Sequence, residues 1–256
     1  AHGRVSTGDV AAAIRPDTAL VSVMHANNEV GTIQPIGEIA AITRARGIPL
    51  HCDAAQSAGK IVVDVEALGV DLLTLAGHKF HATKGVGALY VRPGTAIGPI
   101  VFGADQEHGL RPGTENVPAI VGFGAAARLA REHLPATTES LRQLRDDLNA
   151  RLAAAIPGLA LNGHPEHRLP NTLHVSFPGV SGRSLLEAAR ADVAASVGSA
   201  CHAEGDAVSG VLAAMGLDAA RAMGAVRLSV GTITTPPEIA RAARALAAAW
   251  RALASR

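Results

Sequence analysis

A histidine and a lysine follow an apolar run at Gly77-His-Lys79, and glycines recur soon after at Lys84-Gly-Val-Gly87. The run before them, residues 72–76, has the composition of a buried strand. A lysine held at the end of such a strand is expected to lose water, which favours the neutral amine. A neutral amine can form a Schiff base with an aldehyde cofactor. The alternative is a solvated basic loop between two strands, and this stretch by itself favours that alternative.

A carboxylate and an amide follow two other apolar runs. Asp53, in Asp53-Ala-Ala-Gln56, ends the run 48–53, and Asn28 follows the run 19–25. A carboxylate at Asp53 can hold the protonated ring nitrogen of a pyridine-type cofactor, or it can cap a turn by accepting backbone N–H bonds. Asparagine is a common turn former, so turn chemistry is the stronger interpretation of Asn28 when it is taken alone.

Three later residues lie in settings that favour chemistry. Thr114, in Arg111-Pro-Gly-Thr114, offers a hydroxyl that suits a phosphate, although Gly-rich loops are often only loops. Cys201 lies in a polar loop of small residues, where an accessible thiol can act as a nucleophile and transfer the group that it has taken up. The alternative is a surface cysteine without a function. Arg227 lies inside an apolar strand and needs a carboxylate, either of a substrate or of a structural acid.

Histidines raise metal binding as a rival interpretation. His78 and His81 are close in sequence, and His51 lies on the neighbouring predicted strand. Zinc sites use three or four ligands with a recognisable spacing, commonly with cysteine or carboxylate among them. That spacing is absent, so we predict no metal site. His78 can instead donate to a phosphate.

Several of these candidate residues follow strands in a segment where predicted strands and helices alternate. Strands are predicted at 19–25, 48–53 and 70–76, with a helix at 36–46 between the first two. The alternation implies a parallel sheet with right-handed crossovers, and ligands gather outside the carboxyl ends of such strands. Asn28, Asp53 and the His78–Lys79 pair are therefore expected to converge on one ligand, which the geometry does not identify.

The second half of the chain predicts a different unit. Helices are expected at 118–134 and 139–156, punctuated by Pro135. We place the domain boundary there, so residues 1–134 form a large domain and residues 135–256 a smaller α+β domain. Further strands are predicted at 159–161, 172–177, 193–197 and 226–230, and further helices at 183–190, 209–215 and 237–254.

Composition narrows the class of protein. The chain has 256 residues, 48% of them apolar, which is enough for one large core or two moderate ones. A net charge of +1 with interspersed charges argues against nucleic-acid or anionic-membrane partners, and no apolar run reaches membrane-spanning length without a charge. Two cysteines, Cys52 and Cys201, are too few for a disulfide framework, so we expect a cytoplasmic protein.

Six motifs, in this order, resemble those of the cysteine desulfurases, a branch of the class V aminotransferases among the fold-type I pyridoxal-phosphate enzymes. They are Met24-His-Ala-Asn-Asn-Glu-Val-Gly31, Asp53-Ala-Ala-Gln56, Gly77-His-Lys79 with Lys84-Gly-Val-Gly87, Arg111-Pro-Gly-Thr-Glu-Asn116, Gly198-Ser-Ala-Cys201 and Arg227-Leu-Ser-Val-Gly231. The match covers nearly the whole chain. It implies an α/β fold, with a mostly parallel sheet in a large domain that is incomplete at its N-terminus and a smaller α+β C-terminal domain.

The resemblance also implies how the cofactor, pyridoxal 5'-phosphate, would be held. Lys79 would bind it as a Schiff base, and Asp53 would hold its ring nitrogen. Asn28 and Gln56 would contact the phenolic oxygen and its surroundings. His78 would contact the phosphate.

Substrate and partner roles follow from the same resemblance. Thr114 would reach the phosphate in the partner subunit of a homodimer. Arg227, with Asn28, would hold the carboxylate of L-cysteine. Cys201 would take the substrate sulfur as a persulfide, leaving L-alanine, and would pass it to a sulfur-acceptor protein such as an iron–sulfur scaffold.

The chain departs from the family's pattern in three places. Ala76 replaces a hydroxyl residue that binds phosphate, and Thr232 stands where an arginine is common. The family's N-terminal part, with a phosphate-binding turn and the histidine that stacks on the cofactor ring, is not in this chain, so we expect a fragment or a truncated relative. The alternatives are a selenocysteine lyase or aminotransferase-like lyase on the same scaffold, and a non-catalytic sulfur-relay or scaffold protein.

Overall fold

The computed structural model describes residues 2–198 and 209–255, and its internal contacts divide the chain into two compact units. The four-stranded unit comprises residues 6–25 and 35–134. The three-stranded unit comprises residues 1–5, 26–34 and 135–256. The sequence places a single boundary between residues 134 and 135. By contacts, the two short segments 1–5 and 26–34 join the residues that follow this boundary.

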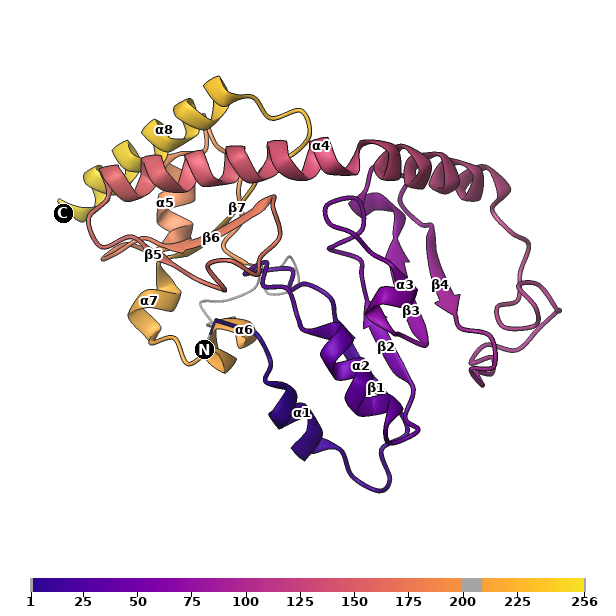
Figure 1. The fold of residues 1–256 in the computed structure, drawn as a ribbon. Helices are drawn as coiled ribbons and strands as arrows, with labels where there is room; N and C mark the ends of the chain where they lie inside the picture. The colour runs from indigo at the N-terminus through magenta and orange to yellow at the C-terminus, as the bar shows by residue number, and fades with distance from the viewer. Residues whose placement is uncertain (1, 199–208, 256) are drawn as a thin grey trace. The chain divides into compact units, whose positions relative to one another are not determined.

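The four-stranded unit is built on a sheet with the strand order β1-β2-β3-β4 (Figure 1). β1 (Val21–Met24), β2 (Leu50–Asp53) and β3 (Leu72–Ala76) run parallel, and β4 (Gly87–Val91) pairs antiparallel with β3. The helices are α1 (Thr7–Ala13), α2 (Ile36–Arg44) and α3 (Val65–Leu68), of which α2 and α3 connect successive parallel strands. The predicted α/β fold with a mostly parallel sheet is confirmed.

One face of this sheet is apolar because successive side chains of a strand point to opposite sides. Leu50, Cys52 and Leu73 lie on that face and are fully or almost fully buried. Ile36 and Ile39 of α2 complete the same cluster, since residues three apart share a face of a helix. The apolar face therefore fixes the register of β1 to β3 and the positions where these strands end.

The opposite face of β1 to β3 carries a polar row. His51 on β2 is hydrogen-bonded through Nδ1 to Ser22 Oγ on β1 and through Nε2 to Thr74 Oγ1 on β3, both at 2.7 Å. Both ring nitrogens are thus occupied by hydroxyl groups. Within residues 2–198 and 209–255, no group of three His, Cys, Asp or Glu side chains is arranged to hold a metal ion.

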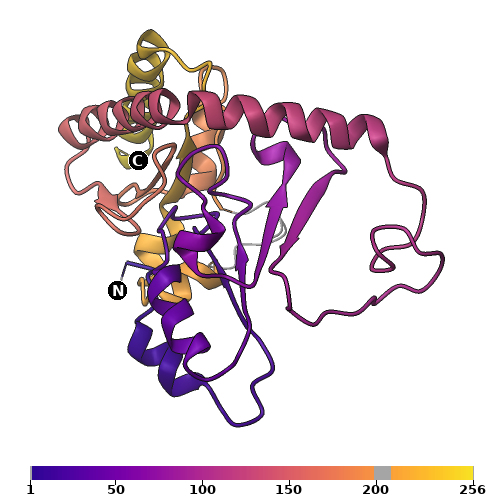
Figure 2. The same cartoon turned by 45° about the vertical axis from the view of Figure 1, so that its right-hand side comes forward.

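The three-stranded unit packs an antiparallel sheet, in the order β5-β6-β7, against helices (Figures 1 and 2). Its strands are β5 (Ala160–Leu161), β6 (Thr172–Ser176) and β7 (Ala225–Ser229), and its helices after α4 are α5 (Gly182–Ala188), α6 (Gly210–Ala214), α7 (Ala219–Met223) and α8 (Pro236–Ala254). The core joins one sheet face to α4 and α8, with Leu148, Leu152, Leu173, Val226 and Leu246 among its buried members. The other face of β6 and β7 is polar.

Helix α4 (Val117–Ala155) is one helix of 39 residues, although the sequence predicts two. A proline inside a helix removes one hydrogen bond and crowds the preceding turn, so Pro135 is expected to end the helix. Most residues in the turn before Pro135 are strong helix formers, and ion pairs one turn apart, Arg128–Glu132 and Arg142–Glu139, support the helix before and after the proline. The predicted break is therefore wrong.

Two smaller differences concern the three-stranded unit. The predicted strand at 193–197 is reduced to one bridge, in which Ser196 pairs with Arg227 of β7. Helix α7, which the sequence pattern does not mark, begins after the capping residue Asp218, whose side chain accepts from the Arg221 N–H at 2.8 Å.

Among the helices that the structure describes, none has the length and apolar character needed to cross a membrane.

The close approach of Gly224 to Phe177, the residue after β6, generates a stability prediction. A Cβ atom at Gly224 would collide with the carbonyl oxygen of Phe177, so Gly224→Ala is expected to lower the free energy of unfolding by about 1–3 kcal/mol. The control is Gly122→Ala in α4, where an added Cβ meets no atom within 4 Å. Removing this helical glycine is expected to raise stability by up to about 1 kcal/mol. Urea unfolding of both variants measures the difference, and an unchanged Gly224→Ala protein would contradict the packing described.

Candidate active site

Lys79 is the last residue of η1 (Gly77–Lys79), a single 3-10 turn that directly follows β3. Gly77 is required at its start, because a Cβ there would lie 2.9 Å from the carbonyl oxygen of Val86. His78 and Lys79 both have exposed side chains. The expectation that the strand end would strip water from Lys79 is therefore wrong, since the turn carries the side chain beyond the buried part of the sheet.

The half-buried amine at this edge is Lys60, which the sequence pattern does not mark as a site residue. Its Nζ donates to the carbonyl oxygen of Gln56 at 3.0 Å and to that of Lys79 at 3.2 Å. Burial, and then the charge of Lys79, lower the pKa of Lys60 to about 8. Lys60 thus ties the turn after β2 to the turn after β3. No local sequence pattern marks Lys60, because both of these acceptors are backbone carbonyl oxygens.

Apolar contacts hold the same two turns together. Gly59 has a φ of 73°, and a Cβ at this position would lie 2.9 Å from the Cβ of Phe80. Phe80 is only 5% exposed, and its ring meets that of Phe123 edge-on, with centroids 5.1 Å apart. The backbone on either side of Lys79 is therefore fixed by packing as well as by the Lys60 hydrogen bonds.

Asp53 ends β2, next to the strand that leads to Lys79. Its exposed carboxylate accepts one hydrogen bond, from the Ala55 N–H to Oδ1 at 2.9 Å, so it caps the following turn. The capping contact uses one oxygen, so both interpretations of Asp53 remain compatible with its geometry. The neighbouring thiol is different in character, because burial, and then the charge of Asp53, raise the pKa of Cys52 to about 12.

Thr114 lies in the loop between β4 and α4 with its side chain exposed. Arg111 orders this loop from within, since it donates to the carbonyl oxygen of Gly113 at 2.7 Å and pairs with Glu107 at 3.2 Å. The amide N–H of Gly113 donates to Gln106 Oε1 at 2.9 Å. The loop thus presents a threonine hydroxyl on an internally hydrogen-bonded backbone.

In the three-stranded unit, the structure brings Asn28 and Arg227 together. Arg227 Nη1 donates to the backbone carbonyl oxygen of Asn28 at 2.9 Å. The turn itself is made by Asn27, whose Oδ1 accepts from the N–H groups of Glu29 and Val30, each at 2.9 Å. Asn28 lies within this turn, as its turn-forming interpretation predicts, but the side chain that caps the turn is that of Asn27.

Cys201 lies outside the described residues. On one side of it, the backbone of Ser196 pairs with that of Arg227 at 2.7 and 3.3 Å. On the other side, Ser209 Oγ donates to the buried carboxylate of Glu29 at 2.6 Å. The residues that flank the segment 199–208 are thus attached to the strand of Arg227 and to the turn that carries Asn28.

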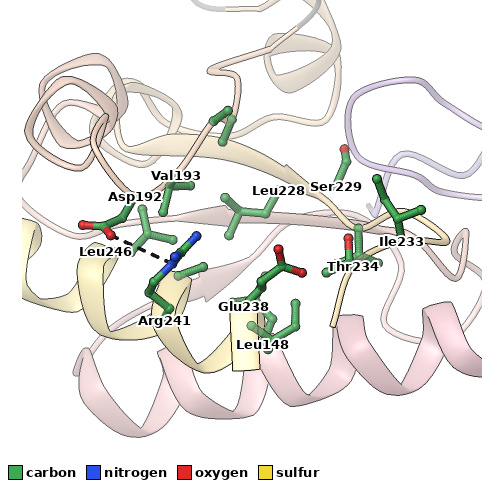
Figure 3. Close-up of a pocket in the computed structure, with 15 residues that line it drawn as sticks. Leu148, Asp192, Val193, Leu228, Ser229, Ile233, Thr234, Glu238, Arg241 and Leu246 are labelled. Atoms are coloured by element: carbon green, nitrogen blue, oxygen red, sulfur yellow. Dashed lines mark ion pairs between the residues drawn. The ribbon is translucent and has the colours of Figure 1, made fainter. Parts of the chain in front are cut away.

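A pocket in the three-stranded unit, of about 380 Å³, does not include these residues (Figure 3). Leu228, Ile239 and Leu246 line it, and Arg241 forms an ion pair with Asp192 at 4.0 Å beside them. Leu228 points to the face of β7 opposite to that of Arg227, because side chains alternate along a strand. None of the candidate site residues that the structure describes lines this pocket.

Comparison with known proteins decides the family. The Aminotransferase class-V family matches residues 1–241. The chain belongs to the class V aminotransferase family. The cysteine desulfurase IscS of Anaeromyxobacter sp. (strain Fw109-5) is 48% identical over 239 residues, which are 93% of this chain and 59% of that protein. The chain thus spans less than two thirds of that relative's length.

Solved structures agree with this membership. A NifS-like protein superposes with a TM-score of 0.88 at 37% identity, over 96% of this chain and 65% of that one. SspA in complex with cysteine superposes with a TM-score of 0.75 at 36% identity, over 90% of this chain and 63% of that one. The predicted resemblance to cysteine desulfurases is therefore confirmed, and members of this family use pyridoxal phosphate as their cofactor.

The lowered pKa of Lys60 gives a pH-dependent prediction for stability. The unfolded chain binds more protons at Lys60 than the folded chain does between about pH 8 and about pH 10. Wild-type stability is therefore expected to rise with pH across this window. Lys60→Met keeps an unbranched stem but has no titrating amine, so this part of the rise is expected to be absent in urea unfolding.

Lys84→Met is the matched control, because Lys84 is exposed in the loop after Lys79. This variant is expected to follow the wild-type pH dependence. If Lys60→Met and wild type showed parallel stability profiles between about pH 8 and about pH 10, the assigned environment of Lys60 would be incorrect.

Proposed function

We propose that this chain carries the chemistry of a pyridoxal-phosphate-dependent cysteine desulfurase, which converts L-cysteine to L-alanine and passes the sulfur to Cys201. The main support is the edge of the parallel sheet, where the turns of Asp53 and Lys79 follow neighbouring strands and Lys60 ties them together. Relatives named cysteine desulfurase, and the similar SspA in complex with cysteine, support the choice of substrate.

The donors at this edge suit pyridoxal phosphate. A primary amine such as that of Lys79 bonds to an aldehyde, and a carboxylate such as that of Asp53 holds the proton of a pyridine nitrogen. His78 and Thr114 offer N–H and O–H donors for the phosphate, and they carry more of this role because Ala76 has no hydroxyl. When bound, the cofactor supplies an electron sink for the carbon that bears the substrate's amino group.

The protein groups then act on the substrate and on the cofactor ring as follows. Lys79, as a general base, moves the proton of the substrate's α-carbon, which positioning next to the reacting carbon makes efficient. Asp53 keeps the ring nitrogen protonated. Arg227 holds the substrate carboxylate, because a guanidinium matches two carboxylate oxygens at once, and Asn28 lies beside it.

Sulfur transfer falls to Cys201. Its thiolate attacks the substrate sulfur, so an S–S bond forms while the C–S bond breaks and its electron pair moves to carbon. Protonation of that carbon leaves L-alanine, and the persulfide passes its outer sulfur to a thiolate of an acceptor protein, such as an iron–sulfur scaffold. Cys52 cannot substitute, since it is fully buried and its pKa is raised to about 12.

We further propose a cytoplasmic homodimer. Apolar side chains are exposed in the loop before α4 and in its first turns, with Ile100 93% and Phe102 84% exposed, and Val101, Val117 and Val121 also exposed. A run of large exposed apolar side chains, as at residues 100–102, is typical of an interaction site. A second copy is the expected occupant, because the same loop carries Thr114. The reduced thiol of Cys52 suits a reducing compartment.

Cofactor attachment can be tested directly. Incubation with pyridoxal phosphate is expected to give a protein with visible absorbance, and Lys79→Ala is expected to lose it because the other amine at this edge, that of Lys60, is held by the carbonyl oxygens of residues 56 and 79. Lys84→Ala, five residues further on, is the control and is expected to colour normally. Wild-type protein that stays colourless would count against the enzyme and favour the sulfur-relay or scaffold alternative.

The role of Cys201 separates a desulfurase from its enzymatic alternatives. Cys201→Ala is expected to reduce alanine release from L-cysteine to background, because the substrate sulfur then has no acceptor. Mass spectrometry of wild type after treatment with L-cysteine is expected to find one added sulfur on the peptide that contains Cys201. Alanine release that persists in Cys201→Ala would instead support a selenocysteine lyase or an aminotransferase-like lyase.

A further inference from the structure

His174, on β6, is a buried histidine that none of these steps uses. It is 1% exposed, and its Nδ1 lies 3.0 Å from the side-chain nitrogen of Asn162. Its other ring nitrogen, Nε2, is also buried and has no hydrogen-bond partner among the residues that the structure describes. Buried polar atoms are nearly always partnered in folded proteins, so this nitrogen calls for an explanation.

The neighbours of Asn162 determine which nitrogen of His174 carries the proton. Asn162 Oδ1 accepts from Arg221 Nε at 2.9 Å, so the amide nitrogen faces Ser176 Oγ, at 2.8 Å, and His174. The amide N–H therefore donates to Nδ1, and in the neutral ring the proton lies on Nε2. Burial, and then the charge of Arg227, lower the pKa of His174 to about 4, so the ring is neutral near pH 7.

The strand order determines where the Nε2–H group points. Asn162 follows β5, on one side of β6, and Arg227 lies on β7, on the other side, directly opposite His174 in the β6–β7 pairing. Since the two ring nitrogens face away from each other, Nε2–H lies on the Arg227 side. A donor and a guanidinium thus share the polar face of this sheet.

Arg227 has unused donors of its own. Its single side-chain hydrogen bond in the described part of the chain is the one from Nη1 to the Asn28 carbonyl oxygen, and it forms no ion pair there. Glu29, which follows Asn28 in the sequence, accepts from Ser209 Oγ. In the described part of the chain, therefore, His174 and Arg227 are opposite each other on the polar face and neither is partnered by an anion.

We propose that His174 Nε2–H and the Arg227 guanidinium together bind the α-carboxylate of the amino-acid substrate. The inference rests on the proposed function, which assigns that carboxylate to Arg227. A carboxylate has lone pairs enough to accept from both groups, and it neutralises the guanidinium while it satisfies the buried imidazole N–H. His174 contributes a neutral donor, so it adds selectivity for a carboxylate without adding a second buried charge.

Ligand binding at this site is therefore expected to require the α-carboxylate. A site built to hydrogen-bond a substrate group rejects an analogue that lacks this group, because its buried donors are then left unpaired. Amines of the same size without a carboxylate are expected to bind poorly, and this discrimination is expected to depend on His174.

The first experiment needs no cofactor. The chain is labelled with ¹⁵N-histidine, the His174 Nε2–H resonance is assigned with His174→Asn, and acetate is added against chloride at equal ionic strength. A saturable shift of this resonance with acetate, absent with chloride, is the expected result. An unmoved resonance would mean that a buried water alone holds the donor, and it would overturn the proposal.

The second experiment uses the protein loaded with pyridoxal phosphate. Binding of L-alanine and of ethylamine, which lacks the carboxylate, is followed by visible absorbance in wild type, His174→Phe and His174→Gln. His174→Phe is expected to weaken L-alanine binding about tenfold or more while ethylamine binding stays unchanged, and His174→Gln, which keeps a donor, is expected to recover part of the loss. Equal effects on both ligands, or none on L-alanine, would overturn the proposal.

The two experiments separate the two ideas. A wild-type protein that does not take up pyridoxal phosphate contradicts the proposed function, and the acetate titration then still decides whether His174 and Arg227 bind a carboxylate. A loaded protein whose His174→Phe variant treats L-alanine as wild type does contradicts this inference alone.

Discussion

The hydrogen bonds of Lys60 are the contact on which the candidate cofactor edge depends. Parallel pairing brings the ends of β2 and β3 side by side, but a strand end does not by itself fix the side chain that follows it. Here one half-buried ammonium group bridges the carbonyl oxygens of Gln56 and Lys79, and Gly59 lets the same turns pack on Phe80. The positions of Asp53 and Lys79 are therefore set by the coupling of two turns. This coupling places the amine of Lys60 near that of Lys79, whose charge lowers the pKa of Lys60.

Most of this edge was predictable because its signals are local. Strand positions follow from runs of apolar residues, and polar residues just beyond those runs indicate where a ligand binds. Lys60 could not be recognised in this way, since its partners are backbone carbonyl oxygens whose positions exist only in the folded chain. The same holds for Asn27, because two adjacent asparagines give no sign of which one caps the turn.

The errors have a different origin. Pro135 is a strong local signal for a helix end, yet α4 continues through it, because helix-forming sequence and packing on both sides outweigh one lost hydrogen bond. For a related reason the sequence leaves two interpretations of Lys79, one desolvated and one solvated, since the apolar run says how buried the strand is and nothing about the turn after it; the side chain is exposed. The segment 26–34 belongs by contacts to the three-stranded unit, which no local pattern indicates.

The two units hold different parts of the proposed chemistry with independent contacts. In the four-stranded unit, the groups suited to the cofactor depend on parallel strand ends and on Lys60. In the three-stranded unit, the proposed carboxylate recognition depends on the antiparallel β6–β7 pairing that sets His174 opposite Arg227, and on the hydrogen bond from Arg227 to Asn28. Because neither set of contacts uses the other, the proposed substrate selectivity can change through β6 and β7 while Lys79, the proposed cofactor lysine, keeps its surroundings.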